Sequence, residues 1–289
     1  MVFGGPAIIS RAWLNGIECR VPGDSPALKA YNISYYVLAE LFGEQWVREY
    51  VFQSNTPTFL LNNYSDDKQA AIHVIRVIHL AEMLINCQWI PGYAGCIKQL
   101  ETPDMIESTY AELDIARALI THQAEFRFNE RIMKKGEDFD LLVTFPNGRE
   151  VCADTKCKLE STPFSEQTIK NSLDDARKRN LPSDRPGIIF VKIPREWVQD
   201  ESSHQQLIEI TNRFLRPTGR IVSVKYYTSL VAEDGLLVRE IIGWYEIANP
   251  HNRFDRAADW RLFATVSEKA TSWNGMPPHW KRILKGDSI

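Results

Sequence analysis

The chain has 289 residues, of which 44% are hydrophobic and 25% charged, and its formal net charge is −3. This composition is typical of a globular protein with one large or two smaller domains. It excludes the strong overall positive field that many nucleic-acid-binding proteins have. A polyanionic ligand would therefore have to be bound by a local basic cluster or through a metal ion.

The five cysteines are odd in number and include no Cys-x-x-Cys pair. Neither a disulfide framework nor a structural zinc site is indicated. The N-terminus lacks the basic start and long apolar run of a signal peptide. No stretch reaches the roughly 18 uncharged apolar residues of a membrane span. We therefore expect a cytoplasmic protein without a membrane partner.

The first third of the chain has the apolar periodicity of helices. We expect one helix over residues 34–52 and a second, largely buried one over residues 66–87. His73 and His79 are not at same-face spacing on the second helix, so we interpret both as structural histidines rather than metal ligands. Residues 1–105 are therefore predicted to form a helical N-terminal region, which could select the substrate or form a homodimer.

After a turn-rich connector at residues 89–95 the pattern changes to alternating strands and helices. We expect helices at 108–121, 165–180 and 207–215, and strands at 126–132, 139–145, 151–157, 187–193, 221–231 and 236–247. The order α-β-β-β-α-β from residue 108 predicts an α/β fold with a mixed sheet over residues 106–249. Residues 250–289 form a basic, tryptophan-containing C-terminal extension.

The chemistry is concentrated in the hairpin of residues 138–156. Its turn, Phe145-Pro-Asn-Gly148, has proline and asparagine where a type I turn prefers them, followed by a glycine suited to a left-handed conformation. This pattern predicts a three-residue loop with a G1 bulge and Phe145 opposite Arg149.

Counting back from this turn places Asp140 opposite Asp154 and Asp138 opposite Lys156, all on one face. The other face carries apolar residues that we expect in the core, namely Phe139, Leu141, Val143, Phe145, Val151, Ala153, Thr155 and Cys157. A two-residue loop would shift this register by one residue, so the prediction depends on the bulge.

Two opposed aspartates repel each other, and the repulsion raises the pKa of one of them. Protonation, an intervening lysine or a bound divalent cation can each relieve it. Oxygen ligands alone favour Mg²⁺ or Mn²⁺ over zinc. The alternative interpretation is a hairpin in which Asp138 pairs with Lys156 and both aspartates are solvated.

The hairpin and its surroundings resemble the PD-(D/E)XK nuclease superfamily, which has the restriction-endonuclease-like fold. The family pattern places one acidic residue on a strand and an acidic-x-Lys motif on the next, here Asp140 and Asp154-Thr155-Lys156. A glutamate on the preceding helix often completes the site, and Glu112 matches it. The proline-aspartate dipeptide of the family is replaced here by Glu137-Asp138.

The resemblance implies that Asp140, Asp154 and the Thr155 carbonyl bind the metal, and that Glu112 binds it directly or through water. It implies that Lys156 orients or activates the attacking water and stabilises charge on the phosphate. Further candidates for substrate contact are Asp138, Lys158, Gln167, Lys170 and Arg177. The basic run at residues 177–179 could instead be a solvated helix end. The basic and aromatic residues of the C-terminal extension could line a nucleic-acid groove, or its tryptophans could fill an edge of the core.

We therefore expect a Mg²⁺- or Mn²⁺-dependent nuclease that hydrolyses phosphodiester bonds of DNA rather than RNA. The alternative is a catalytically inactive module that retains the nuclease fold and binds nucleic acid or a protein partner. A metal-free hydrolase is disfavoured, because no Ser-His-Asp order or GxSxG motif occurs.

Overall fold

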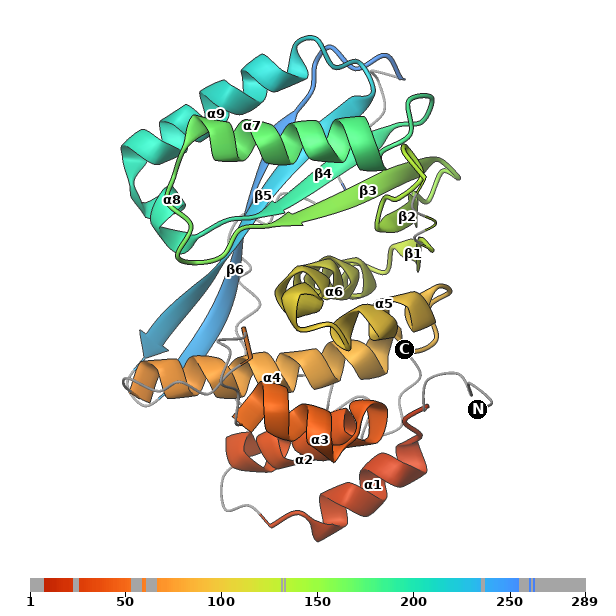
Figure 1. The fold of residues 1–289 in the computed structure, drawn as a ribbon, viewed down its shortest axis with the longest axis vertical. Coiled ribbons are helices and arrows are strands. Elements are labelled where there is room, and N and C mark those ends of the chain that lie inside the picture. Colours follow the sequence, from red (N-terminus) through yellow and green to blue (C-terminus); the bar gives the residue numbers. More distant parts are fainter. Residues whose placement is uncertain are drawn as a thin grey trace.

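A computed structural model describes residues 8–22, 26–52, 59–60, 67–130, 132, 134–234, 237–254, 260 and 262. A six-stranded mixed sheet lies above a stack of N-terminal helices, and further helices cover its upper face (Figure 1). The predicted α/β class is therefore confirmed.

The N-terminal region is helical, as predicted. Its elements are α1 (Arg11–Arg20), α2 (Pro26–Phe42), α3 (Glu44–Val47), the π-helix η1 (Arg48–Phe52), α4 (Asp67–Cys87) and α5 (Tyr93–Leu100). The helix expected over residues 34–52 is interrupted at Gly43, whose φ of 88° is incompatible with a right-handed helix. The sequence pattern also did not predict α1 and α5 as helices.

Helix α4 is the central element of this region. Among the described residues, its segment Gln69–Cys87 is the one helix apolar and long enough to cross a membrane by composition alone, and 67% of its apolar window is buried inside the protein. His73 is held by the carbonyl of Leu60 at 2.6 Å and the hydroxyl of Tyr31 at 2.9 Å. These contacts confirm its structural role.

The sheet has the strand order β1-β2-β3-β4-β5-β6. The strands are β1 (Glu125–Phe128), β2 (Leu141–Thr144), β3 (Glu150–Cys157), β4 (Gly187–Lys192), β5 (Ile221–Asp234) and β6 (Leu237–Ala248). Strands β3, β4 and β5 run parallel, and the other neighbouring pairs are antiparallel. From helix α6 (Ile106–Thr121) onwards the element order is the predicted α-β-β-β-α-β.

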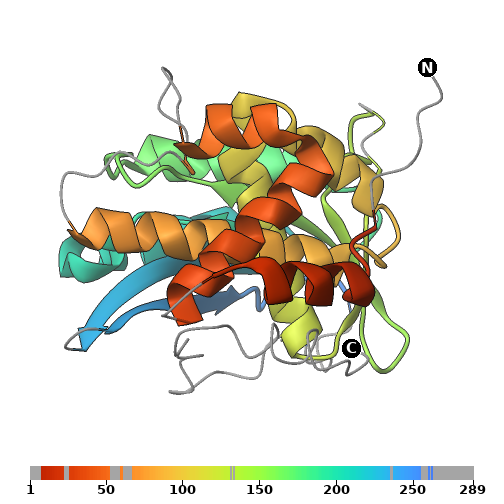
Figure 2. The same cartoon turned by 90° about the horizontal axis from the view of Figure 1, so that it is seen from below.

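Parallel strands need crossover connections, which here are helical. Helix α7 (Glu166–Asp175), continued by the π-helix η3 (Ala176–Asn180), connects β3 to β4. Helices α8 (Arg195–Gln199) and α9 (Glu201–Leu215) connect β4 to β5. Helices α7 and α9 lie on one face of the sheet and α6 lies on the other (Figure 1). Seen from below, the N-terminal helices cross over the α6 side (Figure 2).

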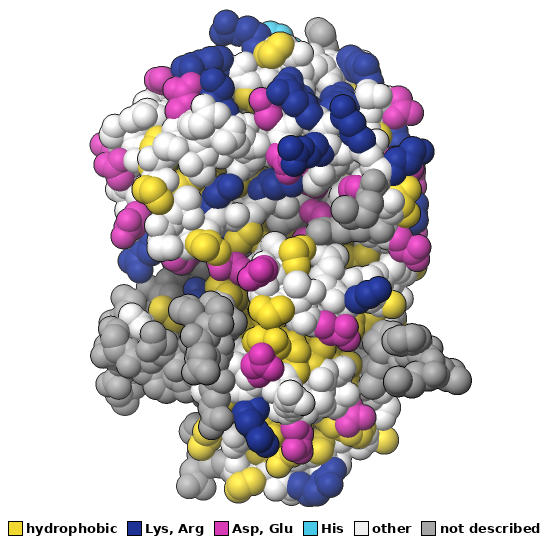
Figure 3. Space-filling view, viewed as in Figure 1, with side chains coloured by type: hydrophobic (Ala, Val, Ile, Leu, Met, Phe, Trp, Pro, Cys, Tyr) yellow, Lys and Arg dark blue, Asp and Glu magenta, His cyan; other side chains and the backbone are white. Residues whose placement is uncertain are grey.

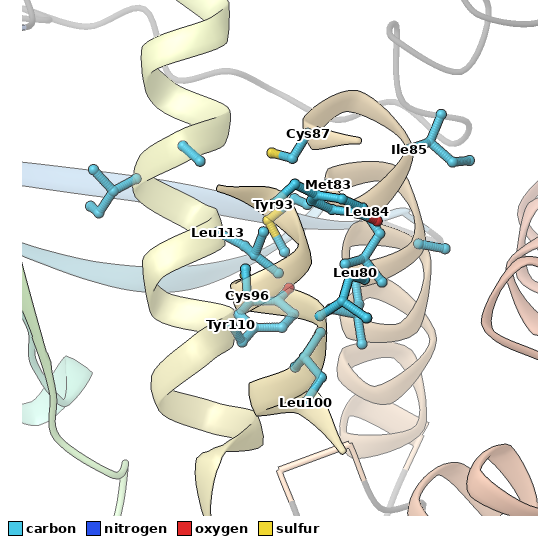
Figure 4. Close-up of a cluster of buried hydrophobic side chains, with 14 of the residues drawn as sticks. Leu80, Met83, Leu84, Ile85, Cys87, Tyr93, Cys96, Leu100, Tyr110 and Leu113 are labelled. Atoms are coloured by element: carbon cyan, nitrogen blue, oxygen red, sulfur yellow. The ribbon is translucent and has the colours of Figure 1, made fainter. Parts of the chain in front are cut away.

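Two hydrophobic clusters form on the two faces of the sheet. The α6 side of β2 and β3 contributes Leu141, Val143, Val151 and Ala153, as predicted, to the larger cluster. That cluster continues between α4, α5 and α6 through residues such as Leu84, Cys96 and Leu113 (Figure 4). The α7 side contributes Leu142 and Cys152 to a second cluster.

Phe139 was expected in the first cluster but belongs to the second. Strand β2 begins only at Leu141, so strand alternation does not extend to residue 139. Trp260 packs against Phe145 with ring centroids 5.7 Å apart, which supports the core-edge interpretation for this tryptophan. Trp273 and Trp280, with most of the predicted C-terminal extension, lie outside the described residues.

Gly92 fixes the approach of α5 to β1. It precedes α5 with a φ of 84°, and a Cβ placed there would lie 2.3 Å from the carbonyl oxygen of Phe128. The Gly92→Ala substitution therefore combines left-handed strain of about 1–2 kcal/mol with a backbone clash. We expect it to lower the free energy of unfolding by roughly 3 kcal/mol or more in urea denaturation.

Gly148→Ala, in the turn after β2, is the matched control. Its φ is also positive, but nothing lies within 4 Å of an added Cβ. It should cost only the conformational strain of about 1–2 kcal/mol. Equal losses in the two variants would show that the contact with Phe128 does not constrain the fold.

Candidate functional site

The β2–β3 turn has the predicted geometry. The Phe145 N–H donates to the Arg149 carbonyl at 2.7 Å, the Gly148 N–H donates to the Phe145 carbonyl at 2.8 Å, and Gly148 has a φ of 79°. The resulting register pairs Leu141 with Ala153. The predicted bulge and the register it determines are therefore confirmed.

Asp140 lies one residue before β2, where the regular strand pairing ends. Its N–H donates to the Ala153 carbonyl at 3.0 Å, and its Oδ2 accepts the Thr155 N–H at 2.6 Å. The Asp140 side chain thus accepts the Thr155 N–H in place of a backbone carbonyl of the neighbouring strand. Since the N–H and C=O of one residue in a strand point the same way, the Thr155 carbonyl is also directed toward this side.

Asp154 is fully buried on the α7 side of the sheet. It is two residues from Cys152 on β3, so the two side chains point to the same face. Its Oδ1 accepts a hydrogen bond of 2.7 Å from the Asn180 side-chain amide. Its Oδ2 forms an ion pair with the Lys156 ammonium at 3.1 Å, but has no well-oriented hydrogen bond among the described residues. One oxygen of a buried carboxyl is thus left incompletely satisfied.

Lys156 connects the strand to the covering helix. Its Nζ lies 3.0 Å from Oδ2 of Asp175, at the end of α7, as well as 3.1 Å from Asp154. Lys156 is therefore held between two carboxylates, one buried and one partly exposed.

The electrostatics of the site are dominated by burial. The pKa of Asp154 is raised to about 7, mainly by burial and in addition by the nearby Asp140 carboxylate, while Lys156 and Asn180 offset part of the rise. Burial by itself would lower the pKa of Lys156, but Asp154, Asp175 and Asp140 together raise it above its ordinary value. Lys156 is consequently cationic at neutral pH, whereas Asp154 keeps its proton to a higher pH than an ordinary aspartate.

The predicted pairing of Asp138 with Lys156 is wrong. Asp138 precedes β2 in a loop, and its Oδ1 accepts the Ile132 N–H at 3.0 Å. The turn determines the register only as far as the strands remain paired, and this pairing ends before residue 138.

Glu112, expected to complete the acidic group, stays a prediction in that role. It is buried on α6, which packs against the opposite face of the sheet from α7 (Figure 1). Within the described ranges, no group of three or more His, Cys, Asp or Glu side chains is arranged to hold a metal ion. The acidic part of the site is therefore the pair Asp140 and Asp154.

A pocket of about 500 Å³ opens beside Lys156. Its lining combines the basic residues Lys158, Lys178 and Arg179 with Asp174 and Asp175. It belongs to the part of the molecule where Lys and Arg side chains gather on the surface (Figure 3). Lys158, a predicted substrate contact, is thus placed beside the site.

The other candidates, on α7 and η3, do not line this pocket. Gln167 is exposed and donates to Asn171 at 2.6 Å, and Lys170 lies 3.7 Å from Glu166. Arg177 bonds to Thr218 at 3.0 Å and to Asp174 at 2.6 Å, on the side of the helix that faces α9.

The sequence interpretation missed Asp175 and Asn180, which contact Lys156 and Asp154. A signal for them was present in the hairpin. Leu142 and Cys152 are apolar and share a face with Asp154, so that face had to be covered. The crossover helix after β3 is the element that covers it, and polar residues near its end lie over the strand's polar positions.

The raised pKa of Asp154 predicts a pH-dependent stability. An aspartate in the unfolded chain titrates near pH 4, whereas Asp154 in the folded protein keeps its proton to about pH 7. Between these two pH values the folded state binds more protons than the unfolded state, so the protein loses stability as pH rises from about 4 to about 7. In chelator-containing buffer, Asp154→Asn should be more stable than wild type at pH 8, by about 1–2 kcal/mol, and similar to wild type at pH 4. Urea denaturation across this range measures the difference.

Asp174→Asn is the control of opposite sign. Burial opposes ionisation of Asp174, but Lys178 and Arg177 outweigh it and lower its pKa. Removing the Asp174 carboxylate should therefore lower the free energy of unfolding at neutral pH. A destabilised Asp154→Asn at pH 8 would mean that Asp154 is a required partner of Lys156 rather than a source of repulsion.

Comparison with known proteins assigns no family to this geometry. No protein-family model matches the chain, and no curated protein matches it. The chemistry of the site must therefore be inferred from the arrangement of its own residues.

Proposed function

We propose that the protein is a divalent-metal-dependent nuclease that hydrolyses phosphodiester bonds in DNA, in a cytoplasmic setting. The observation that carries this proposal is the pair of buried carboxyls, Asp140 and Asp154, next to a cationic Lys156 that is in ion-pair contact with Asp154. The basic pocket beside Lys156 supplies the place for a phosphate.

The residues present suit a Mg²⁺ or Mn²⁺ ion. Asp154 has an incompletely satisfied buried oxygen, Asp140 lies close enough to raise the pKa of Asp154, and the Thr155 carbonyl is directed toward Asp140. Mg²⁺ is commonly held by one or two carboxylates and keeps several waters, so Asp140 and Asp154 suffice to hold it. When bound, such an ion lowers the pKa of a ligand water and polarises the phosphoryl oxygens.

Lys156 contributes positive charge rather than a proton-accepting group. Its raised pKa keeps it protonated at neutral pH, so it is unsuited to act as a general base. Asp154 and Asp175 hold the ammonium from two sides, which orients it toward the pocket that it lines. There it can stabilise the negative charge that develops on a phosphate in the transition state.

The basic residues around Lys156 give this pocket its substrate preference. Lys158 is partly buried, and burial lowers its pKa, so a neighbouring phosphate would be a favourable partner. Lys178 and Arg179 extend the positive charge along η3. Phosphate contacts of this kind position a strand without reading its sequence.

The arrangement of elements supports the proposed nuclease fold by analogy. The order α6-β1-β2-β3-α7-β4 and the position of the acidic residues on β3 and just before β2 are those expected of a PD-(D/E)XK domain. Fold analogy alone does not establish activity, so the proposal rests on the acidic pair and Lys156.

A catalytically inactive module that binds nucleic acid or a protein partner is the second candidate. One observation favours it: Asp154 already has Asn180 and Lys156 as partners. In such a module the acidic pair would be a structural polar cluster, and the basic pocket alone would account for binding.

Metal-dependent stabilisation separates the two candidates. Mn²⁺ at 100 times its Kd should stabilise wild type by about 2.7 kcal/mol, because the ion binds only the folded state. We expect the Tm increase to vanish in Asp140→Ala and to persist in Lys156→Ala. Plasmid cleavage should fall by about a hundredfold or more in both.

Asp174→Asn serves as the control, because it removes a carboxylate that lines the same pocket without belonging to the acidic pair. It should retain both the Tm shift and cleavage. A wild-type protein with neither a metal-dependent Tm shift nor cleavage of DNA would contradict the nuclease proposal and favour the binding module.

A further inference from the structure

A second and larger pocket, of about 770 Å³, shares Lys178 of η3 with the Lys156 pocket. Its walls come from the end of β1, the loop before β2, and the segment that follows η3. The loop is tied down by hydrogen bonds from Gly136 N–H to the Arg179 carbonyl, at 2.5 Å, and from the Asn129 amide to the Glu137 carbonyl, at 2.7 Å. These bonds give the pocket a defined shape.

The lining of this pocket is basic. Among the described residues it includes five Lys or Arg side chains and three Asp or Glu side chains. Lys178 and Arg185 are paired with Asp174 and Glu150 outside the pocket, at 3.0 and 2.7 Å. In the described part of the chain, no carboxylate lies within ion-pair distance of the remaining three, which are Arg127, Lys135 and Arg220.

Arg220 lies near other positive charges that the described carboxylates do not fully neutralise. Its guanidinium donates to the Arg177 carbonyl, and Arg253 donates to the carbonyl of Ser183 in the pocket wall. Burial lowers the pKa of Arg220, and the neighbouring charges of Arg177 and Arg253 lower it further. A bound anion would relieve this repulsion.

The pocket also offers apolar surface. Ile132, 56% exposed, and the side chains of Pro91 and Pro182 contribute to its walls. A ligand with both phosphate groups and a flat apolar face therefore fits it better than a small inorganic anion. Aromatic or apolar contact with unpaired bases, combined with a basic groove, is how proteins bind single-stranded nucleic acids.

Lys178 lines both this pocket and the pocket beside Lys156, so the two sites share one positive wall. A strand bound beside Lys156 can therefore continue past η3 into the larger pocket. Pockets of 300–1,000 Å³ hold ligands of drug-like size, which corresponds to one or two nucleotides and excludes a duplex.

We infer that the pocket bordered by Arg127, Lys135 and Arg220 binds unpaired nucleotides of a DNA strand that extends from the site at Lys156. This inference rests on the proposed function, because it takes the ligand of the Lys156 site to be DNA. It makes the protein selective for DNA with a single-stranded segment next to the position bound at Lys156.

Binding measurements without metal test this inference separately from cleavage. The full chain is titrated in EDTA, by fluorescence anisotropy, against a duplex with a single-stranded overhang and against the blunt duplex of the same sequence. Arg127 and Lys135 are both exposed, so the double variant Arg127→Ala/Lys135→Ala should fold normally. Arg11→Ala/Lys98→Ala is the matched control, since it removes one exposed arginine and one exposed lysine on α1 and α5.

We expect the pocket variant to bind the overhang DNA about tenfold more weakly and the blunt duplex within about twofold of wild type, whereas the control variant binds both normally. The slope of log K for overhang DNA against log salt concentration should become shallower by about 1.4. The variant removes two cations, and each contact with a single-strand phosphate contributes about 0.7 to this slope.

Equal weakening on both DNAs, no weakening on either, or a wild-type protein that does not prefer the overhang would each overturn the inference. A parallel plasmid-cleavage assay distinguishes this failure from failure of the proposed function. If the protein binds overhang DNA selectively but does not cleave, the pocket assignment stands and the nuclease proposal fails. If the protein cleaves but the pocket variant binds both DNAs like wild type, the nuclease proposal stands and the pocket assignment fails.

Discussion

Two carboxyl groups lie close together at the point where β2 and β3 separate, and one of them is fully buried. The buried Asp154 carboxyl is stable in this position only if it is protonated, paired or bound to a cation, and its pKa near 7 reflects that conflict. Lys156, Asn180 and Asp175 are arranged around it as partial compensation. The chemistry proposed for this protein depends on how that conflict is resolved.

The fold creates the conflict through two simple constraints. The bulged turn sets the register that brings Asp140 to the vicinity of Asp154, and the parallel connection from β3 to β4 forces α7 to cross over the same face. Coverage by α7 removes water from Asp154, while the end of α7 and η3 supply the polar partners. The same helix end lines two basic pockets that share Lys178.

The sequence was sufficient for features determined by local geometry. The Pro-Asn-Gly turn determined the register of the hairpin, and the periodicity of the apolar residues located α4, the strands and the α-β-β-β-α-β order. It was insufficient where distant elements meet, because the face on which α6 packs follows from tertiary packing and not from its own pattern. Asp138 was misplaced because the pairing of β2 with β3 does not reach back to residue 138. Asp175 and Asn180 were missed because their contacts depend on where the crossover helix ends.

We propose that Asp140 and Asp154 together hold a divalent cation. Anomalous diffraction from a crystal soaked in Mn²⁺ tests this most directly, because it locates the ion without reference to activity. We expect a peak about 2.0–2.2 Å from carboxylate oxygens of both aspartates, with Lys156 still beside Asp154. No peak there at saturating Mn²⁺, with Asp154 bonded only to Lys156 and Asn180, would show that the acidic pair is a structural cluster.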